Sequence, residues 1–157
     1  MIVKKSEFRL LGFEVMNSII QQVPEPSDNN PADNFDNFKI DYDFNVLRLN
    51  DSTFMLVNQL KINEVKEPVP GYRIELDFAT VFQFADLEKL EEKEINKFLI
   101  NSGVSMTLGA IRGYLETVTS YMLFGKYSLP SIDMVDFNNR KYSESQEKDS
   151  SRSSSDN

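Results

Sequence analysis

GVSMTLGAIRGYLETVTSYMLFGKYSLPSIDMVDF, residues 103–137, is the stretch that decides how this chain folds. Gly103 predicts a left-handed helix stop, and a long helix is expected from there to Phe124. Gly125 follows it, and an extended segment is expected from Tyr127 to Phe137. The helix is apolar over about half of its circumference, wider than the roughly 100° stripe that a surface helix needs. The sequence therefore predicts more apolar surface than one sheet covers.

This apolar half is built from two neighbouring stripes. The first consists of Leu108, Ile111, Leu115, Val118 and Met122, and the second of Ala110, Tyr114, Tyr121 and Phe124. The residues predicted to contact a client or a second subunit are Tyr114, Tyr121, Met122, Phe124 and Tyr127, with ordinary core packing as the alternative. Gly109 and Gly113 form a small-residue face, which predicts either close helix packing between subunits or the seating of the helix on its own sheet.

Four strands are expected upstream of this helix. Three alternate between apolar and polar residues, at 38–46, 54–62 and 72–84, and a less regular fourth runs from Phe8 to Ile20. Gly12 indicates a bulge in that fourth strand, and a change of alternation predicts a bulge or a strand end near Val46. Asn50, Asp51 and Ser52 are typical of a hairpin turn between two of the strands.

The segments between these strands and the long helix are expected to be simpler. Residues 24–37 carry three prolines with Asn and Asp, which predicts a mobile surface loop that tolerates substitution. A short first helix is expected from Glu88 to Asn101. The domain is predicted to span residues 1–137. Residues 138–157 lack apolar anchors and are predicted to form a disordered polar tail.

The composition argues for a binding protein rather than an enzyme. The chain has 25 acidic and 17 basic residues, with a net charge of −8, which disfavours nucleic acid and anionic membrane surfaces as partners. It has no His and no Cys, so Ser–His and Cys–His nucleophiles, disulfides and thiolate metal sites are excluded. We expect no catalytic residues, no cofactor, no metal, no membrane insertion and a cytoplasmic location.

Acidic residues are expected to gather on the sheet face opposite the core. If the strands share one sheet, this predicted acidic face contains Asp41, Asp43, Glu75 and Asp77, with Met55 and Val57 beside them. Such a patch suits a basic partner. The alternative is a solvated face with no partner.

The closing segment carries a resemblance to a known family. Gly125, Tyr127, Ile132, Val135 and Phe137 match, at identical spacing, the pattern Arg-Gly-x-Phe-Pro-x-Leu-x-Leu-x-x-Val-Asn-Phe. Together with the order of strands and helices over roughly residues 38–137, this segment resembles the SecB family of export chaperones. The proline falls at position 130 instead of 128, and Leu115 replaces the arginine that the family has beside the acidic residue found here as Glu116.

The resemblance implies an α+β fold in which a four-stranded antiparallel sheet is followed by a short and a long helix packed on one face. It implies a homotetramer, a dimer of dimers, that holds unfolded polypeptides without ATP and delivers preproteins to SecA. Glu75 stands where the family's SecA-contacting acidic residue lies. Three alternatives remain: a dedicated chaperone of an antitoxin or other single client, a small-ligand-binding α+β domain, and a purely structural oligomerisation domain.

Overall fold

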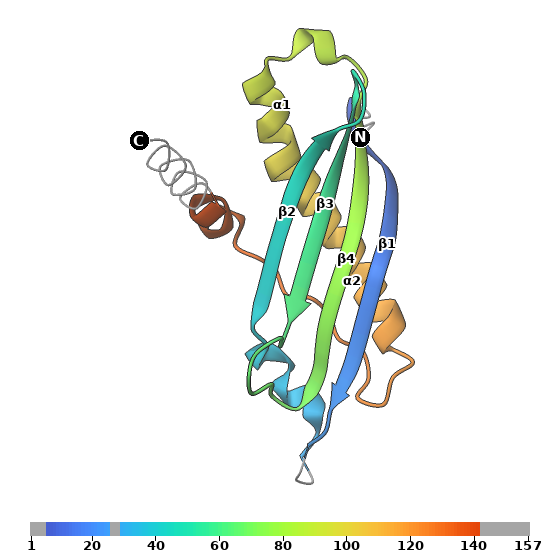
Figure 1. The fold of residues 1–157 in the computed structure, drawn as a ribbon, viewed down its shortest axis with the longest axis vertical. Coiled ribbons are helices and arrows are strands. Elements are labelled where there is room, and N and C mark those ends of the chain that lie inside the picture. Colours follow the sequence, from blue (N-terminus) through green and yellow to red (C-terminus); the bar gives the residue numbers. More distant parts are fainter. Residues whose placement is uncertain (1–5, 26–28, 142–157) are drawn as a thin grey trace, which may run out of the picture.

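The computed structural model describes residues 6–25 and 29–141 and has one antiparallel sheet with helices across one face (Figure 1). The strands are β1 (Phe8–Val23), β2 (Ile40–Arg48), β3 (Thr53–Ile62) and β4 (Gly71–Phe84), in the order β1-β4-β3-β2. The main helices are α1 (Glu92–Phe98) and α2 (Val104–Thr119). The predicted α+β class, the four strands and the β2–β3 hairpin are confirmed.

Strand alternation places the core on the face that the helices cover. In β4 every second side chain from Tyr72 to Phe84 is buried, while the residues between them, from Arg73 to Gln83, face the other side. Burying each large apolar side chain contributes about 1.5–3 kcal/mol. The core contains one polar link between sheet and helix, where the Thr80 and Thr107 hydroxyls lie 2.8 Å apart.

The two predicted bulges have different outcomes. The β1–β4 register shifts between Leu10 and Gly12, which confirms the bulge that Gly12 indicates. Near Val46 the bulge is wrong, because β2 pairs with β3 without a shift, and the alternative of a strand end is confirmed, since β2 ends at Arg48. Val46 and Leu47 are 39% and 46% exposed, so neither face of this strand end is buried. The alternation of apolar and polar residues therefore does not report the strand geometry there.

The predicted helix stop at Gly103 is also wrong. Gly103 has a right-handed φ of −61°, and a π-helical turn at Leu99–Gly103 joins α1 to α2 without a break. A Cβ atom there would lie 3.4 Å from Leu56 Cδ1 and 3.5 Å from Phe8 Cζ. The glycine therefore allows close approach of helix and sheet instead of reversing the chain.

The long helix ends earlier than Phe124, at Thr119. The Thr119 hydroxyl donates to the carbonyl of Leu115 and accepts the backbone N–H of Tyr127. It therefore joins the helix end to the segment that follows. Gly125, with a φ of +78°, lies in the turn between them, as a glycine there predicts.

The β1–β2 connection is more ordered than a mobile surface loop. Residues Pro31–Asn37 form the 3₁₀ helix η1, and the Asn30 side chain accepts the backbone N–H of Ala32 at its start. The Phe35 ring packs against Phe38, Tyr72 and Tyr127. The expectation that the whole connection tolerates substitution is therefore wrong at Phe35.

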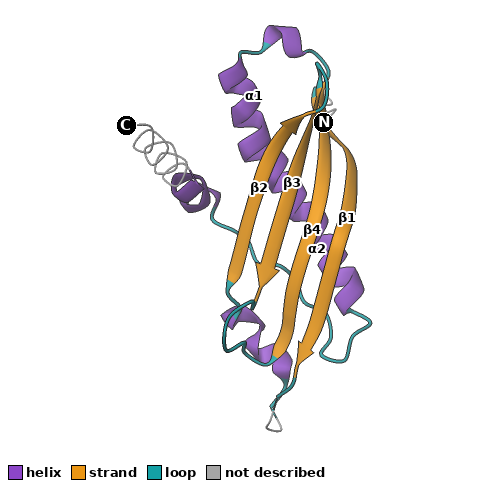
Figure 2. Cartoon of the chain, viewed as in Figure 1, coloured by secondary structure: helices purple, strands orange, loops and turns teal. Residues whose placement is uncertain are grey.

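The closing segment crosses behind the sheet and ends in a helix beside β2 (Figure 2). Residues 125–133 have no regular structure and residues 134–141 are helical, so the extended segment ends before Phe137. Asp133 starts this helix because its carboxylate accepts the backbone N–H groups of Val135 and Asp136. Residues 138–141, where the polar tail was predicted to begin, continue this helix. Residues 142–157 lie outside the described part of the chain.

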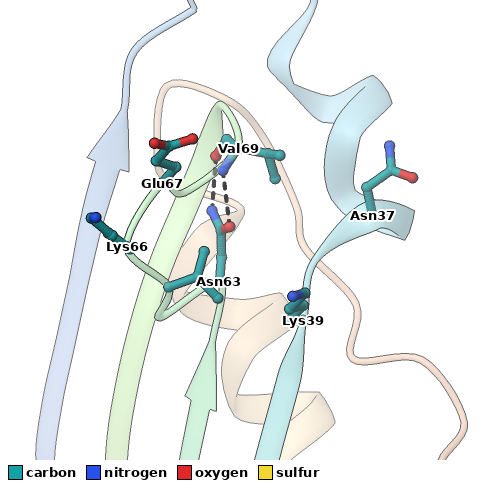
Figure 3. Close-up of a pocket in the computed structure, with 7 residues that line it drawn as sticks. Asn37, Lys39, Asn63, Lys66, Glu67 and Val69 are labelled. Carbon is teal, nitrogen blue, oxygen red and sulfur yellow. Dashed lines mark hydrogen bonds between the residues drawn. The ribbon is translucent and has the colours of Figure 1, made fainter.

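Asn63 organises the connection between β3 and β4 (Figure 3). It has a positive φ of 57° and is 1% exposed. Its side-chain amide donates to the carbonyls of Val69 and Tyr72 and accepts the Val69 N–H, at 2.8–3.0 Å. Its backbone N–H donates to the carbonyl of Lys39. Asn63 therefore holds the β3–β4 connection against the start of β4.

Candidate functional site

An aromatic cluster lies where η1, the start of β4 and the segment after α2 meet. It consists of Phe35, Phe38, Tyr72, Phe124 and Tyr127. Phe35 and Phe38 lie 5.4 and 5.6 Å from the Tyr127 ring, and Phe124 lies 5.7 Å from the Tyr72 ring. Gly71 permits this packing, since a Cβ atom there would be 2.7 Å from Phe38 Cζ.

The two tyrosines of the aromatic cluster differ in their hydrogen bonds. The Tyr72 hydroxyl donates to the carbonyl of Gly125 at 2.8 Å. The Tyr127 hydroxyl is buried and has no hydrogen-bond partner in the described part of the protein. Burial raises the pKa of Tyr127, so the hydroxyl keeps its proton and remains a donor. A buried donor without an acceptor costs about 1–3 kcal/mol.

Replacing Tyr127 with phenylalanine removes this unpaired hydroxyl. We expect Tyr127→Phe to leave the free energy of unfolding unchanged or to raise it by about 1 kcal/mol, because a buried polar group is lost without a bond. Tyr72→Phe is the matched control and should lower the free energy of unfolding by about 1 kcal/mol. Urea denaturation measures both. A loss for Tyr127→Phe as large as that for Tyr72→Phe would contradict the unpaired assignment.

Apolar surface continues outward from the aromatic cluster. Tyr121 and Leu123, in the turn after α2, are 89% and 78% exposed. An open hollow of about 500 Å³ lies beside Leu123 and Phe124. Its lining residues are Gln22, Pro24, Glu25, Asn29, Pro31, Leu123 and Phe124. Through Phe124, the buried rings and the exposed Leu123 therefore form one apolar region at this end of the sheet.

A second apolar region follows the free edge of β2. Two hollows of about 480 and 450 Å³ lie along it, and Lys141 borders both. Their apolar lining comes from Ile40, Tyr42, Phe44, Val46, Leu99, Ile100, Ile132 and Phe137. Because β2 is an edge strand, its outward backbone groups face no other strand of the sheet.

The predicted contact residues do not form one group. Tyr127 belongs to the buried core, and Phe124 and Met122 are half-buried against it. Tyr114 is also half-buried, and its hydroxyl donates to Ser18 Oγ of β1 at 2.9 Å. Tyr121 alone of the five is fully exposed. Only Tyr121, and in part Met122 and Phe124, are therefore available to a partner at this end.

Gly109 and Gly113 lie on the exposed face of α2. No atom lies within 4 Å of the position that a Cβ would take at either residue. They therefore do not seat the helix on its own sheet, which rules out that explanation of the small-residue face. Met106, 40% exposed, extends the same face toward the start of α2.

The four predicted acidic residues do share the uncovered face of the sheet. The register places Asp41 in the row of Lys61 and Glu75, and Asp43 in the row of Gln59 and Asp77. Most of them have partners within the chain. Asp43 pairs with Lys141, Glu75 lies 3.9 Å from Arg73, and Asp77 accepts from Asn17 and Gln59. The face is a mixed-charge ladder more than an acidic patch.

Sequence reasoning missed several residues of both apolar regions. Phe35 lies in a polar, proline-rich connection. Its own aromatic side chain was the one feature there that could have indicated packing against the core. Tyr42 and Phe44 lie in the strand that alternation predicts at residues 38–46, and nothing in their spacing indicates an edge strand. Phe137 was expected in an extended segment. Its packing on Tyr42 and Phe44, at 5.4 and 6.0 Å, depends on the unpredicted helix.

Within residues 6–25 and 29–141, no group of three or more acidic side chains could hold a metal ion. Among the described helices, none combines the length and the hydropathy that crossing a bilayer requires.

Comparison with known proteins identifies the fold. No protein-family model and no curated protein sequence matches this chain. Among solved structures, the SecB-like chaperone Rv1957 of Mycobacterium tuberculosis, in complex with a ChAD peptide from the antitoxin HigA1, matches with a TM-score of 0.57. The two are 12% identical over 80% of this chain and 88% of the other. A protein of unknown function from Streptococcus agalactiae has a TM-score of 0.41, with 10% identity over 80% and 97%. The chain therefore has a SecB-like fold.

Proposed function

We propose that this protein is an ATP-independent chaperone that binds non-native polypeptide segments. The observation that carries the proposal is the apolar surface that one copy leaves exposed. It consists of Tyr121 and Leu123 after α2, and of Val46, Leu47 and Leu49 at the end of β2. Burying such surface favours binding by about 25 cal/mol per Å², and no catalytic group is needed. The SecB-like fold supports the proposal by analogy.

The choice of client follows from the solved relative. Its structure contains a peptide from an antitoxin. We therefore propose a dedicated antitoxin or other single client as the first alternative to general preproteins. Delivery to SecA has weaker support, because Asp43, Glu75 and Asp77 already have partners in this chain. A cytoplasmic location is part of the proposal, since the clients are nascent or unfolded chains.

Fluorescence anisotropy tests this function. The probe is labelled α-lactalbumin, reduced and carboxymethylated so that it stays unfolded. We expect saturable binding without nucleotide, and no binding of native α-lactalbumin. The double variant Tyr121→Ser with Leu123→Ser should weaken binding, since both side chains are exposed and their replacement leaves the core intact. Equal binding of native and unfolded probe would overturn the proposal. A saturable thermal shift with a small molecule instead would favour a ligand-binding domain.

We further propose that α2 mediates assembly into a homotetramer, a dimer of dimers. The exposed face with Met106, Gly109 and Gly113 is smooth enough for the close approach of a second helix. We expect the substitution Gly113→Leu to lower the molar mass measured by light scattering at micromolar concentration, because a leucine there blocks close approach. Lys93→Leu, at an exposed position of α1, is the control and should leave the mass unchanged. A monomeric wild-type protein would contradict this assembly.

A further inference from the structure

The part of the chain after α2 is held in two different ways. Residues 127–130 are clamped to the helix by backbone contacts. Arg112 donates to the carbonyls of Leu129 and Pro130, at 2.6 and 3.3 Å, and Thr119 accepts the Tyr127 N–H. Tyr127 and Leu129 are each 1% exposed. These residues belong to the fixed core.

Residues 131–141, which we call the strap, are attached by few side chains. Ile132, Met134 and Phe137 pack on the core while remaining half-buried. Asn138 donates to Asn101 at 3.2 Å, and Val135 is 72% exposed. The hydrogen bonds at the start of its helix are made within the strap, by Asp133. The strap can therefore leave the sheet without breaking the contacts of residues 127–130.

Lys141 fastens the end of the strap to the open edge of the sheet. The N–H of Phe44 donates to the Asp43 carboxylate at 2.9 Å, and its carbonyl accepts from Lys141 Nζ at 2.6 Å. The ammonium group also pairs with Asp43 and lies 4.5 Å from the centre of the Phe44 ring. The backbone groups that an added strand would use at Phe44 are therefore occupied from within the chain.

The surface beneath the strap is apolar and strand-like. Phe137 covers Tyr42 and Phe44, which are only 8% and 5% exposed in this closed arrangement. Lifting the strap would expose both rings next to the unpaired edge of β2. It would also join the two hollows that Lys141 separates. An extended apolar polypeptide could then pair with the edge through its backbone and fill the groove with alternate side chains.

We propose that the strap is an autoinhibitory element, which closes the β2 edge against extended polypeptides, and that Lys141 is its latch. This inference rests on the proposed chaperone function and adds a closed state to it. The strap and the client compete for one surface, so the apparent affinity for a client depends on the fraction of molecules with the strap open. Any change that weakens the latch should raise that affinity.

Substitutions at the latch test the proposal in the full chain. We expect Lys141→Gln and Phe137→Ala each to increase the affinity for unfolded α-lactalbumin by about three- to tenfold, because the open fraction rises. Lys93→Gln is the control. Lys93 is exposed on α1 and lines neither hollow, so its replacement removes a positive charge without touching the strap or β2, and the affinity should stay the same. Unchanged affinity in both latch variants would overturn the inference.

Hydrogen exchange and cross-linking separate this inference from the proposed function. The Phe44 amide should exchange faster in Lys141→Gln than in wild type, before any client is added. The chain has no cysteine, so Asn101→Cys with Asn138→Cys can be joined by a short thiol-reactive linker. Linked protein should bind the probe more weakly than the unlinked double variant. Equal affinity of the linked and unlinked forms would contradict the autoinhibitory role of the strap, while the chaperone function would still hold. Absence of binding in every form, wild type included, would overturn both.

Discussion

Gly71→Ala is expected to destabilise the protein by about 3 kcal/mol, because it combines backbone strain with a steric clash. Gly71 has a φ of +130°, which side-chain-bearing residues rarely adopt. Its added Cβ would lie 2.7 Å from Phe38 Cζ and 3.1 Å from Phe35 Cε1. Both rings belong to the aromatic cluster, so the substitution should also loosen η1. Urea denaturation followed by circular dichroism measures the effect.

Gly12→Ala is the matched control for this substitution. It also lies in a strand, its φ is not positive, and no atom lies within 4 Å of the position of an added Cβ. We expect a change of less than about 1 kcal/mol in the free energy of unfolding. Similar stabilities for the two alanine variants would show that the rings do not pack against Gly71 as described.

Asn63→Ala is expected to cost about 3–4 kcal/mol, since it removes three side-chain hydrogen bonds to buried backbone groups and leaves alanine at a positive φ. Asn63→Gly separates the two causes. It loses the same hydrogen bonds without the conformational strain, so it should be about 1 kcal/mol more stable than the alanine variant. Thermal and urea denaturation measure both. If alanine and wild type unfold at the same urea concentration, the β3–β4 connection does not depend on this side chain.

The strands were predictable because burial on one face of a sheet requires alternation. β4 alternates over most of its length, with a break at Phe78–Thr80, and its boundaries were predicted to within one residue. Alternation fails as a guide where neither face is covered, as at Val46 and Leu47. It also cannot show that β2 is an edge strand, since strand order depends on the pairing of β1 with β4.

The glycines and the polar segments were harder to interpret. Gly103 and Gly125 are both typical of a helix end, but only Gly125 has a positive φ. Gly103 is needed because the helix packs closely on Leu56 and Phe8, which lie far away in the sequence. η1 and the helix of the strap lie in polar stretches, where Phe35 and Phe137 order the chain through long-range ring contacts. Local sequence does not contain that information.

The candidate site followed only in part from the sequence. The apolar excess of the chain's last third was predicted, and Tyr121 is indeed exposed. The remaining predicted residues contribute to the core or to the rim of the aromatic cluster. The apolar region along the edge of β2 could not be predicted from the sequence. It is formed by a strand, a helix and Lys141, which lies almost 100 positions away from its partner Asp43.

Aggregation of a thermally unfolded test protein, followed by light scattering without nucleotide, tests the central claim most directly. The account predicts that this protein suppresses the scattering in a concentration-dependent manner and reaches full suppression near stoichiometric ratios. The Lys141→Gln variant should do so at a lower concentration than wild type, and the Tyr121→Ser, Leu123→Ser variant at a higher one. Scattering that rises as fast with the protein as with an equal mass of serum albumin would contradict the account.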